Sequence, residues 1–347
     1  MPSAARRLGL RRRLLFAAIP LLALLFLGEV LIRLFRAPLH FGSFRELRLD
    51  LMARNYPAQR DPMLGYSPRP GFSSRDNHWG TQVTIDADGM RTNGRPSPPG
   101  ERFVATVGDS FTFGDQVDDD ATWPAQLEAL LGKPVKNGGV FGYSLAQAVL
   151  RAEAMLERFP VDTLIVSFIP DDLTRCEYEK RYTPVPWFDV AGDEIVLRNV
   201  PVPLESERDA SKRWKDFLGH SALVDAVLAN TCRQWWFENE KQVRVESLRG
   251  RGGEIGQKLI DRIDAKCRAK GIRLLLLLQD KKPDEASLAL LRHAEARGVR
   301  TLDLASAFDA LATKGPGEHD GWFDGHMTRA GNRWVAERVA AALSESR

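Results

Sequence analysis

Two patterns of apolar positions alternate along residues 101–347. Nearly continuous apolar runs, typical of strands covered on both faces, lie at 103–107, 163–168 and 272–278, and two further strands are expected at 134–137 and 299–304. Segments with apolar residues at helical spacing lie between and after them, at 123–131, 145–158, 254–270, 283–297 and 330–343. Strands that alternate with helices predict an α/β fold, with a parallel sheet and helices on both faces.

The N-terminus carries a longer apolar segment. Residues 14–35 are apolar except for Glu29 and Arg33, and this length is about the 20 residues that a helix needs to cross a bilayer. Glu29 and Arg33 are four apart and are expected to pair near the interface. The segment is preceded by five arginines, which keep that end in the cytoplasm: Arg6, Arg7, Arg11, Arg12 and Arg13.

A cleaved signal peptide is the alternative interpretation of this segment. No small-x-small cleavage site follows it, so we favour an uncleaved, single-pass anchor at 14–35 after a cytoplasmic basic stretch at 1–13. Under either interpretation the remainder is exported, which predicts a periplasmic or other extracytoplasmic domain on the inner membrane.

Two further segments break the alternation. Residues 37–100, rich in proline and glycine, are expected to be a membrane-proximal lead-in packed on the core, with a hairpin near 82–85 and a turn at 86–89. Within the main domain, 101–347, the stretch 173–251 is too long for a connection and is expected to be an insertion. Its aromatic residues either contact the substrate or pack in the insertion's own core, which we favour: Trp214, Trp235, Trp236 and Phe237.

The composition mainly argues against classes of ligand, namely nucleic acids and metal ions. The formal net charge is +3, so nothing indicates a nucleic-acid partner. Cys176, Cys232 and Cys267 lack the spacing of metal ligands and are interpreted as buried small hydrophobic residues. Neither a metal nor another cofactor is therefore expected, and the sequence identifies no protein partner.

The strand at 103–107 runs into a tight turn at Gly108, with Ser110 at its mouth. Open α/β sheets gather their chemistry at such carboxyl ends of strands. The next glycine is Gly114, so the spacing differs from the Gly-x-Ser-x-Gly elbow of α/β-hydrolases. We expect the next helix to begin near residue 123 rather than immediately after the serine.

A serine hydroxyl needs a base that is itself held in place. His326 lies just before the last predicted helix, and Asp324 lies two residues earlier, close enough to fix the imidazole tautomer. The combination of Gly108-Asp109-Ser110 with Asp324-Gly325-His326 resembles the SGNH (GDSL) family of serine hydrolases. Residues 61–66 and 85–91 also resemble the lead-in of bacterial membrane-anchored SGNH proteins.

The resemblance covers about residue 61 to the C-terminus and implies a three-layer, flavodoxin-like parallel sheet. It implies that Ser110 is the nucleophile, that His326 is the general base and that Asp324 orients it. Because the family usually has one more residue between aspartate and histidine, Asp320 is a reserve candidate. The backbone N–H groups of Ser110 and Gly142 match the donors of the oxyanion hole. Asp109 is expected to brace the turn at the serine.

The third family block usually supplies an asparagine followed by an aspartate, and this chain has Asp171 and Asp172. An ionised aspartate has no proton to donate to an oxyanion. Three outcomes are open: Asp171 stays protonated beside Asp172, it turns away and leaves the two backbone N–H groups as the donors, or the site is largely inactive. We favour the second.

The implied activity is that of a serine esterase that forms an acyl-enzyme on Ser110 and acts on carboxylic esters of small molecules, glycans or lipids at the cell envelope. Release of the acyl group to a sugar hydroxyl instead of water would make an O-acyltransferase acting on an envelope polysaccharide. A catalytically degenerate envelope protein that binds glycan is the alternative of a different class.

Overall fold

The computed structural model describes residues 10–36, 42–45, 57–77, 79–94, 101–181, 183–203, 214–215, 217–233, 235–236 and 242–344. The chain divides into two compact units. The N-terminal unit comprises Met1–Ala53 with Ser206–Glu240, and the sheet unit comprises Arg54–Glu205 with Lys241–Arg347. The segment 173–251, which the sequence suggested as one insertion, is therefore divided between the two units.

The sheet unit is built on five parallel strands: β5 (Phe103–Val107), β6 (Val135–Asn137), β7 (Val161–Phe168), β13 (Arg273–Leu278) and β14 (Arg300–Asp303). Their order in the sheet is β14-β13-β7-β5-β6. Numbered along the chain this order is 2-1-3-4-5, which is the flavodoxin-like order. The predicted fold class is confirmed, and the point where the order reverses is the carboxyl end of β5.

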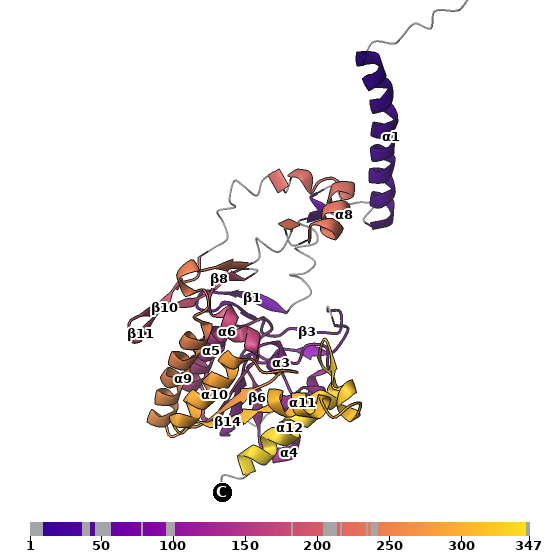
Figure 1. Ribbon diagram of the computed structural model, residues 1–347. Coiled ribbons are helices and arrows are strands. Elements are labelled where there is room, and N and C mark those ends of the chain that lie inside the picture. Colours follow the sequence, from indigo (N-terminus) through magenta and orange to yellow (C-terminus); the bar gives the residue numbers. More distant parts are fainter. Residues whose placement is uncertain are drawn as a thin grey trace, which may run out of the picture. The chain divides into compact units, whose positions relative to one another are not determined.

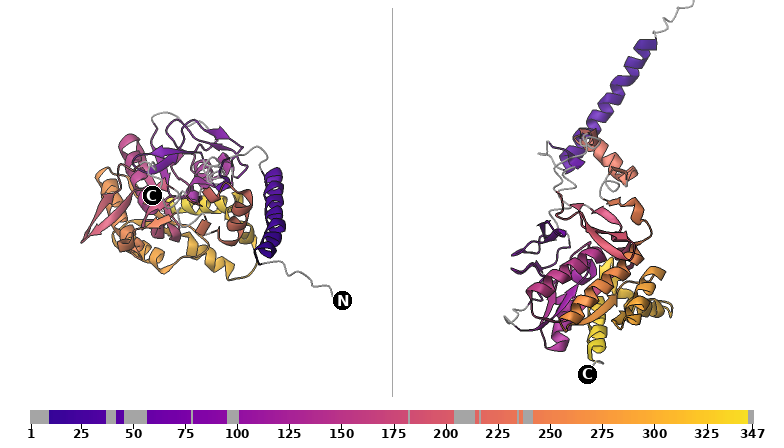
Figure 2. Two further views of the ribbon diagram at one scale, coloured as in Figure 1. Left: turned by 90° about the horizontal axis from the view of Figure 1, so that it is seen from above. Right: turned by 90° about the vertical axis from the view of Figure 1, so that its left-hand side faces the viewer.

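Helices cover both faces of this sheet, as Figures 1 and 2 show. Phe103, Ala105 and Val107 of β5 belong to the core under α5 (Leu145–Arg158), α9 (Gly252–Ala269) and α10 (Glu285–Ala296). Val104 belongs to the opposite core, under α4 (Trp123–Leu131), α11 (Leu304–Ala312) and α12 (Arg329–Ser344). Successive side chains of a strand point to opposite faces, so one apolar run supplies both cores.

Helix α11 is absent from the pattern expected from the sequence, where the run at 299–304 was interpreted as a strand. The strand ends at Asp303, whose carboxylate accepts a hydrogen bond from Ser306 N–H at 2.8 Å and caps the helix that begins at Leu304. A capping aspartate inside an apolar stretch is a weak signal in a sequence.

The lead-in, expected at 37–100, is divided: residues 42–45 belong to the N-terminal unit, and residues 57–94, as far as they are described, belong to the sheet unit. It forms the pairs β1 (Ala58–Asp61) with β2 (Gly65–Pro68) and β3 (Ser73–Ser74) with β4 (Val83–Thr84). The predicted turn is confirmed, since Gly89 N–H donates to Asp86 O at 3.1 Å. After it, Arg91 N–H donates to Asn137 O of the edge strand β6 at 3.0 Å, so the lead-in continues the sheet at this edge.

After β7 the chain forms α6 (Pro170–Arg175), β8 (Tyr178–Arg181), β9 (Thr183–Pro184) and the hairpin β10 (Trp187–Ala191) with β11 (Glu194–Arg198). It returns from the N-terminal unit through β12 (Gln242–Arg244), which pairs with β8. The buried Glu177 then accepts hydrogen bonds from the N–H groups of Gly250 and Gly252, at 3.1 and 2.9 Å. These amides of the glycine-rich loop are therefore occupied by a carboxylate of the chain itself.

The N-terminal unit contains α1 (Leu10–Arg36) and α8 (Ala222–Thr231). Residues Ala18–Phe35 of α1 have a mean hydropathy of 2.2, none of them is buried, and the helix is long and apolar enough to cross a membrane. Glu29 pairs with Arg33, Nε to Oε1, at 2.6 Å, as predicted. Trp236 is fully buried beside Ala229 in a small core of this unit, whereas Phe237 lies outside the described residues. Cys176 and Cys267 are buried as expected, but the interpretation of Cys232 as buried is wrong, because it is exposed at the end of α8.

Candidate active site

The serine lies at the reversal point of the strand order. Gly108, directly after β5, is required by close packing, since a Cβ there would overlap Thr112 Oγ1 and lie 2.7 Å from Ser167 O. The carboxylate of Asp109 accepts the Phe111 N–H at 2.9 Å and caps the one-turn helix α3 (Ser110–Phe113). The expectation that no helix follows the serine directly is therefore wrong, although α4 does begin at Trp123. The expected bracing role of Asp109 is seen in this cap.

A buried arginine of the lead-in holds the other end of α3. The guanidinium of Arg91 donates to Phe113 O at 2.9 Å, Gly114 O at 2.5 Å and Val117 O at 2.6 Å. It also pairs with Asp119 Oδ1 at 3.0 Å, and its side chain is fully buried. The carbonyls that α3 leaves unpaired at its end thus receive donors. The sequence analysis missed this residue, because nothing in a single sequence distinguishes it from other arginines of the lead-in.

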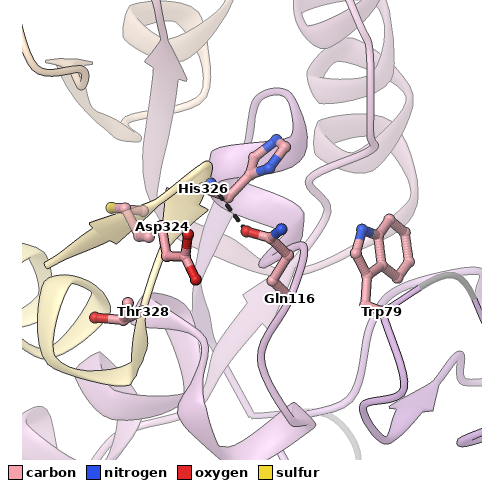
Figure 3. A pocket seen from close by; sticks show the side chains of 6 residues that line it. Trp79, Gln116, Asp324, His326 and Thr328 are labelled. Atoms are coloured by element: carbon pink, nitrogen blue, oxygen red, sulfur yellow. Dashed lines mark hydrogen bonds between the residues drawn. The ribbon is translucent and has the colours of Figure 1, made fainter. Parts of the chain in front are cut away.

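The histidine is presented by a tight turn before α12. The strands β15 (Phe323–Asp324) and β16 (His326–Met327) pair across Gly325, whose φ of +75° is left-handed. The His326 N–H donates to Gln116 Oε1 at 2.9 Å, and Gln116 itself has φ of +72°. This strained residue from the serine loop links the two loops through the contact drawn in Figure 3. The sequence analysis did not identify Gln116 either.

The structure brings Ser110 and His326 together. His326 Nε2 lies 2.9 Å from Ser110 Oγ, although 216 residues separate the two. The hydroxyl also lies 3.3 Å from Asp109 Oδ2, a longer contact to an oxygen that Arg175 shares. Burial lowers the pKa of His326 below its usual 6.5, Asp109 counteracts this and Arg175 adds to it. The imidazole is therefore neutral at neutral pH, the state in which a base accepts a proton.

The structure does not bring Asp324 onto the imidazole. Its side chain is exposed, and Figure 3 shows the carboxylate directed away from the His326 ring. Within the described residues, no hydrogen bond reaches His326 Nδ1. The reserve candidate Asp320 accepts the Gly317 N–H at 3.0 Å. The carboxylate near the ring is that of Asp115, whose Oδ2 lies 3.7 Å from Nε2.

Asp115 is fully buried, and among the described residues its Oδ1 has no hydrogen-bond partner. Burial raises the pKa of Asp115 well above its usual value; Arg91 opposes this and Asp109 adds to it. A carboxyl group whose ionised form is disfavoured by burial is a weak candidate for stabilising an imidazolium ion.

A charge network lies behind the serine turn. Arg175 Nη1 donates to Asp172 Oδ1 at 2.5 Å, to Asp109 Oδ2 at 3.3 Å and to Tyr143 O at 3.2 Å. Burial and the charge of Asp109 raise the pKa of Asp172 well above its usual value, and Arg175 opposes the shift. Asp172 also accepts the Ile169 N–H at 3.1 Å, so it braces the start of α6. One positive charge is thus shared by two buried carboxyl groups.

The two remaining candidates differ in placement. Gly142 lies in the turn before α5, and its carbonyl accepts a hydrogen bond from Arg181. Asp171 is turned outward, with a side chain that is 77% exposed and an Oδ2 that lies 3.8 Å from Arg175 Nη2. The carboxylate of Asp171 therefore lies in solvent, as expected from the sequence.

A pocket of about 320 Å³ adjoins the histidine. The pocket, drawn in Figure 3, is lined by one indole and by mostly polar side chains. The lining residues are Trp79, Gln116, Asp324, His326, Met327 and Thr328. Among the residues that the structure describes, no three histidine, cysteine, aspartate or glutamate side chains are grouped to hold a metal ion.

No protein-family profile matches the chain, and no curated protein matches it in sequence. Structural neighbours over about 70% of the chain are lipolytic G-D-S-L proteins and esterases. A member of the lipolytic G-D-S-L family from Veillonella parvula is 12% identical, with 70% of this chain and 98% of that chain covered and a TM-score of 0.36. TesA is 14% identical over 70% and 99% of the two chains, with a TM-score of 0.39. Axe2, an acetylxylan esterase from Geobacillus stearothermophilus, is 13% identical over 70% and 94%, with a TM-score of 0.35. The assignments below depend on the geometry of this chain.

Proposed function

We propose that the protein is a serine esterase that acts on carboxylic esters through an acyl-enzyme on Ser110. The observation that supports this proposal is the 2.9 Å contact between Ser110 Oγ and His326 Nε2 at the reversal point of the sheet. A hydroxyl at this distance from a neutral imidazole can transfer its proton as it attacks a carbonyl carbon.

The reaction then proceeds in two halves. In the first, Ser110 Oγ bonds to the carbonyl carbon, its proton passes to His326 Nε2, and the same proton leaves with the alcohol as the ester bond breaks. In the second, water attacks the acyl-enzyme, His326 takes a proton from the water and returns it to Ser110 Oγ, and the carboxylic acid departs. The negative charge on the former carbonyl oxygen needs donors in both halves.

We assign these donors to the backbone N–H groups of Ser110 and Gly142. Ser110 is the first residue of α3, where an N–H has no acceptor within the helix. Arg181 and Arg175 hold the carbonyls of Gly142 and Tyr143, and this fixes the turn that carries the second donor. Asp171 is given no part in the hole, because its carboxylate is exposed.

The pocket beside His326 suggests the kind of ester. Its polar lining and the single indole of Trp79 suit an alcohol portion that is polar and ring-shaped better than a long acyl chain. We therefore propose that the preferred substrates are esters in which a small acyl group is attached to a polar alcohol.

The setting of the reaction follows from α1. Glu29 and Arg33 are part of the folded N-terminal unit, since Glu29 Oε1 accepts the Ala222 N–H at 2.9 Å and Arg33 Nη2 donates to His220 O at 2.5 Å. A helix with contacts to residues so far along the chain is better explained as a retained anchor than as a cleaved signal. We propose a single-pass inner-membrane protein with the sheet unit on the periplasmic side.

The direct test is labelling and turnover by the full chain in detergent. A fluorophosphonate probe should label the wild type and the Ser73→Ala control, an exposed serine of β3, but not Ser110→Ala. Hydrolysis of p-nitrophenyl esters of increasing acyl length should favour the short esters. Labelling of Ser110→Ala would refute the assignment, and acyl transfer to an added sugar in place of hydrolysis would identify an O-acyltransferase.

A further inference from the structure

The N-terminal unit contains more than the helix that we propose as anchor. The side chains of Glu29 and Arg33 hold its second part, the described residues of 214–236, against the last turns of α1. Glu29 Oε2 accepts the Ser221 hydroxyl at 2.7 Å and the Leu223 N–H at 2.8 Å, while its Oε1 accepts the Ala222 N–H at 2.9 Å. The acidic residue of the apolar helix thus caps α8, and residues 214–236 are fixed next to the end of α1 (Figure 1).

Helix α8 is apolar around most of its circumference. Its single charged residue, Asp225, is buried and accepts the Trp236 Nε1–H at 3.1 Å. Only Ala222, Asp225 and Ala229 of the helix are buried, whereas Val227 is 49% exposed. A helix that is apolar on all sides belongs in a protein core or in contact with lipid, and this core buries only one stripe of it.

The residues before and after α8 add exposed aromatic side chains. Trp214 is 46% exposed, Phe217 is 76% exposed and Trp235 is 40% exposed. The indole rings of Trp214 and Trp235 lie 5.5 Å apart, and Lys215 Nζ lies 4.7 Å from the Trp235 ring. Lys215 is itself buried and donates to Trp235 O at 3.0 Å, so it holds this aromatic pair in place. Tryptophan is enriched at the membrane–water interface, where its ring lies at headgroup level.

We propose that residues 214–236 form a second membrane contact, in which α8 and the flanking aromatic residues lie in the interfacial layer of the phospholipid bilayer beside α1. The inference rests on the proposed anchoring by α1. We favour the bilayer as the occupant, because the exposed apolar side chains belong to the same folded unit as α1, in which none of the apolar residues Ala18–Phe35 is buried. The segment thus belongs to the membrane attachment and not to the substrate site.

Cys232 supplies a reporter for this contact. It is exposed at the end of α8, and the other two thiols of the chain are buried, so an environment-sensitive NBD maleimide should label it selectively. The full chain is labelled and reconstituted into protein-free liposomes of phosphatidylcholine and phosphatidylglycerol. Lipids that carry a nitroxide at the headgroup, at a shallow acyl position or at a deep acyl position then report the depth of the label.

We expect a blue-shifted emission and strongest quenching by the headgroup and shallow nitroxides. Trp214→Ser/Phe217→Ser/Trp235→Ser should lose most of the shift, whereas Met63→Ser/Leu130→Ser/Val243→Ser, an equal number of exposed hydrophobic residues of the sheet unit, should keep it. Should the triple variant misfold, Phe217→Ser alone, the most exposed of the three, should still reduce the shift.

Retention after alkaline extraction separates this inference from the anchor. Wild-type protein that is retained but shows no quenching of the Cys232 label would overturn the second contact and leave the anchor intact. Protein that is extracted would overturn the anchor. A blue shift that appears in native membranes but not in protein-free liposomes would overturn the bilayer as occupant in favour of a protein partner.

Discussion

Asp324 and His326 are backbone partners across a single glycine, yet the carboxylate of one does not contact the imidazole of the other. Both side chains line the same pocket, and we propose that the Asp324 side chain rotates toward Nδ1 when substrate binds. Catalytic hydrogen bonds are often long in ligand-free structures and form only in the complex.

We therefore expect Asp324→Asn to lower kcat by about a thousandfold to ten-thousandfold, the scale of losing a tautomer-fixing carboxylate. The matched control is Asp115→Asn, which changes the carboxyl group nearest to Nε2. Burial disfavours the ionised form of Asp115, so we expect this variant to stay within a few-fold of the wild type. Steady-state kinetics on one p-nitrophenyl ester measures kcat for both variants. A larger loss of kcat in Asp115→Asn than in Asp324→Asn would assign the orienting role to Asp115.

The pH profile depends on the charge network behind the serine. The base works when neutral, so kcat/KM should rise with pH through the pKa of His326 and then level off, with the rise below pH 6.5 because burial lowers that pKa. Arg175 contributes to the lowering, so removing its charge raises the pKa. Arg175→Met should shift the rise to higher pH, and Arg175→Lys should restore it.

Arg251→Met is the control, since Arg251 pairs with Glu254 outside this network. Thermal melts of each variant establish that the fold is retained. An unchanged profile in Arg175→Met would mean that the network does not act on His326.

The third-block aspartate gives a test of the oxyanion hole. Loss of an oxyanion donor typically costs about a hundredfold to a thousandfold in kcat. Because the Asp171 carboxylate is exposed, we expect Asp171→Asn and Asp171→Ala to change kcat only a few-fold. A loss on the scale of a missing donor in Asp171→Ala would place this residue in the hole and contradict the assignment to two backbone donors.

Two neighbouring ion pairs allow a matched test of stability. Arg91 and Asp119 are buried, whereas Arg75 and Asp118 form an exposed pair at 3.3 Å. Breaking a buried pair typically costs about 3–5 kcal/mol, so Arg91→Met should lower the free energy of unfolding by that amount. An exposed pair is worth about 0–1 kcal/mol, so Arg75→Met should change it little. Urea unfolding followed by fluorescence measures both, and equal effects would contradict the clamp on α3.

The orientation of the chain in the membrane is tested by a fusion after Arg347. Alkaline phosphatase matures outside the cytoplasm, so it should be active at this position if the sheet unit is periplasmic. A reporter that matures only in the cytoplasm should be inactive there, and activity of that reporter would reverse the proposed orientation.

The apolar pattern predicted the central strands β5, β7 and β13 most directly, because strands buried on both faces leave continuous apolar runs in a sequence. The outer strands β6 and β14 and the main helices were also predicted from the alternation of segments. The motifs also predicted that Ser110 and His326 belong to one site. What the sequence did not reveal are the residues that hold this site from behind: Arg91, Gln116 and Arg175. Their roles come from long-range hydrogen bonds to backbone groups, which need only a donor or acceptor at the right place in space and leave no spacing pattern.

The division of the N-terminal unit into two pieces of chain has a consequence for proteolytic release. The polypeptide passes between the two units three times, at residues 53–54, 205–206 and 240–241. A protease that cuts only the first crossing leaves the sheet unit covalently joined to residues 206–240, which still bind α1 through Glu29. A cut at either of the other crossings leaves it joined to α1 through the first. With α1 as the proposed anchor, release of the sheet unit from the membrane therefore requires more than one cleavage, and singly nicked protein should remain in the membrane fraction.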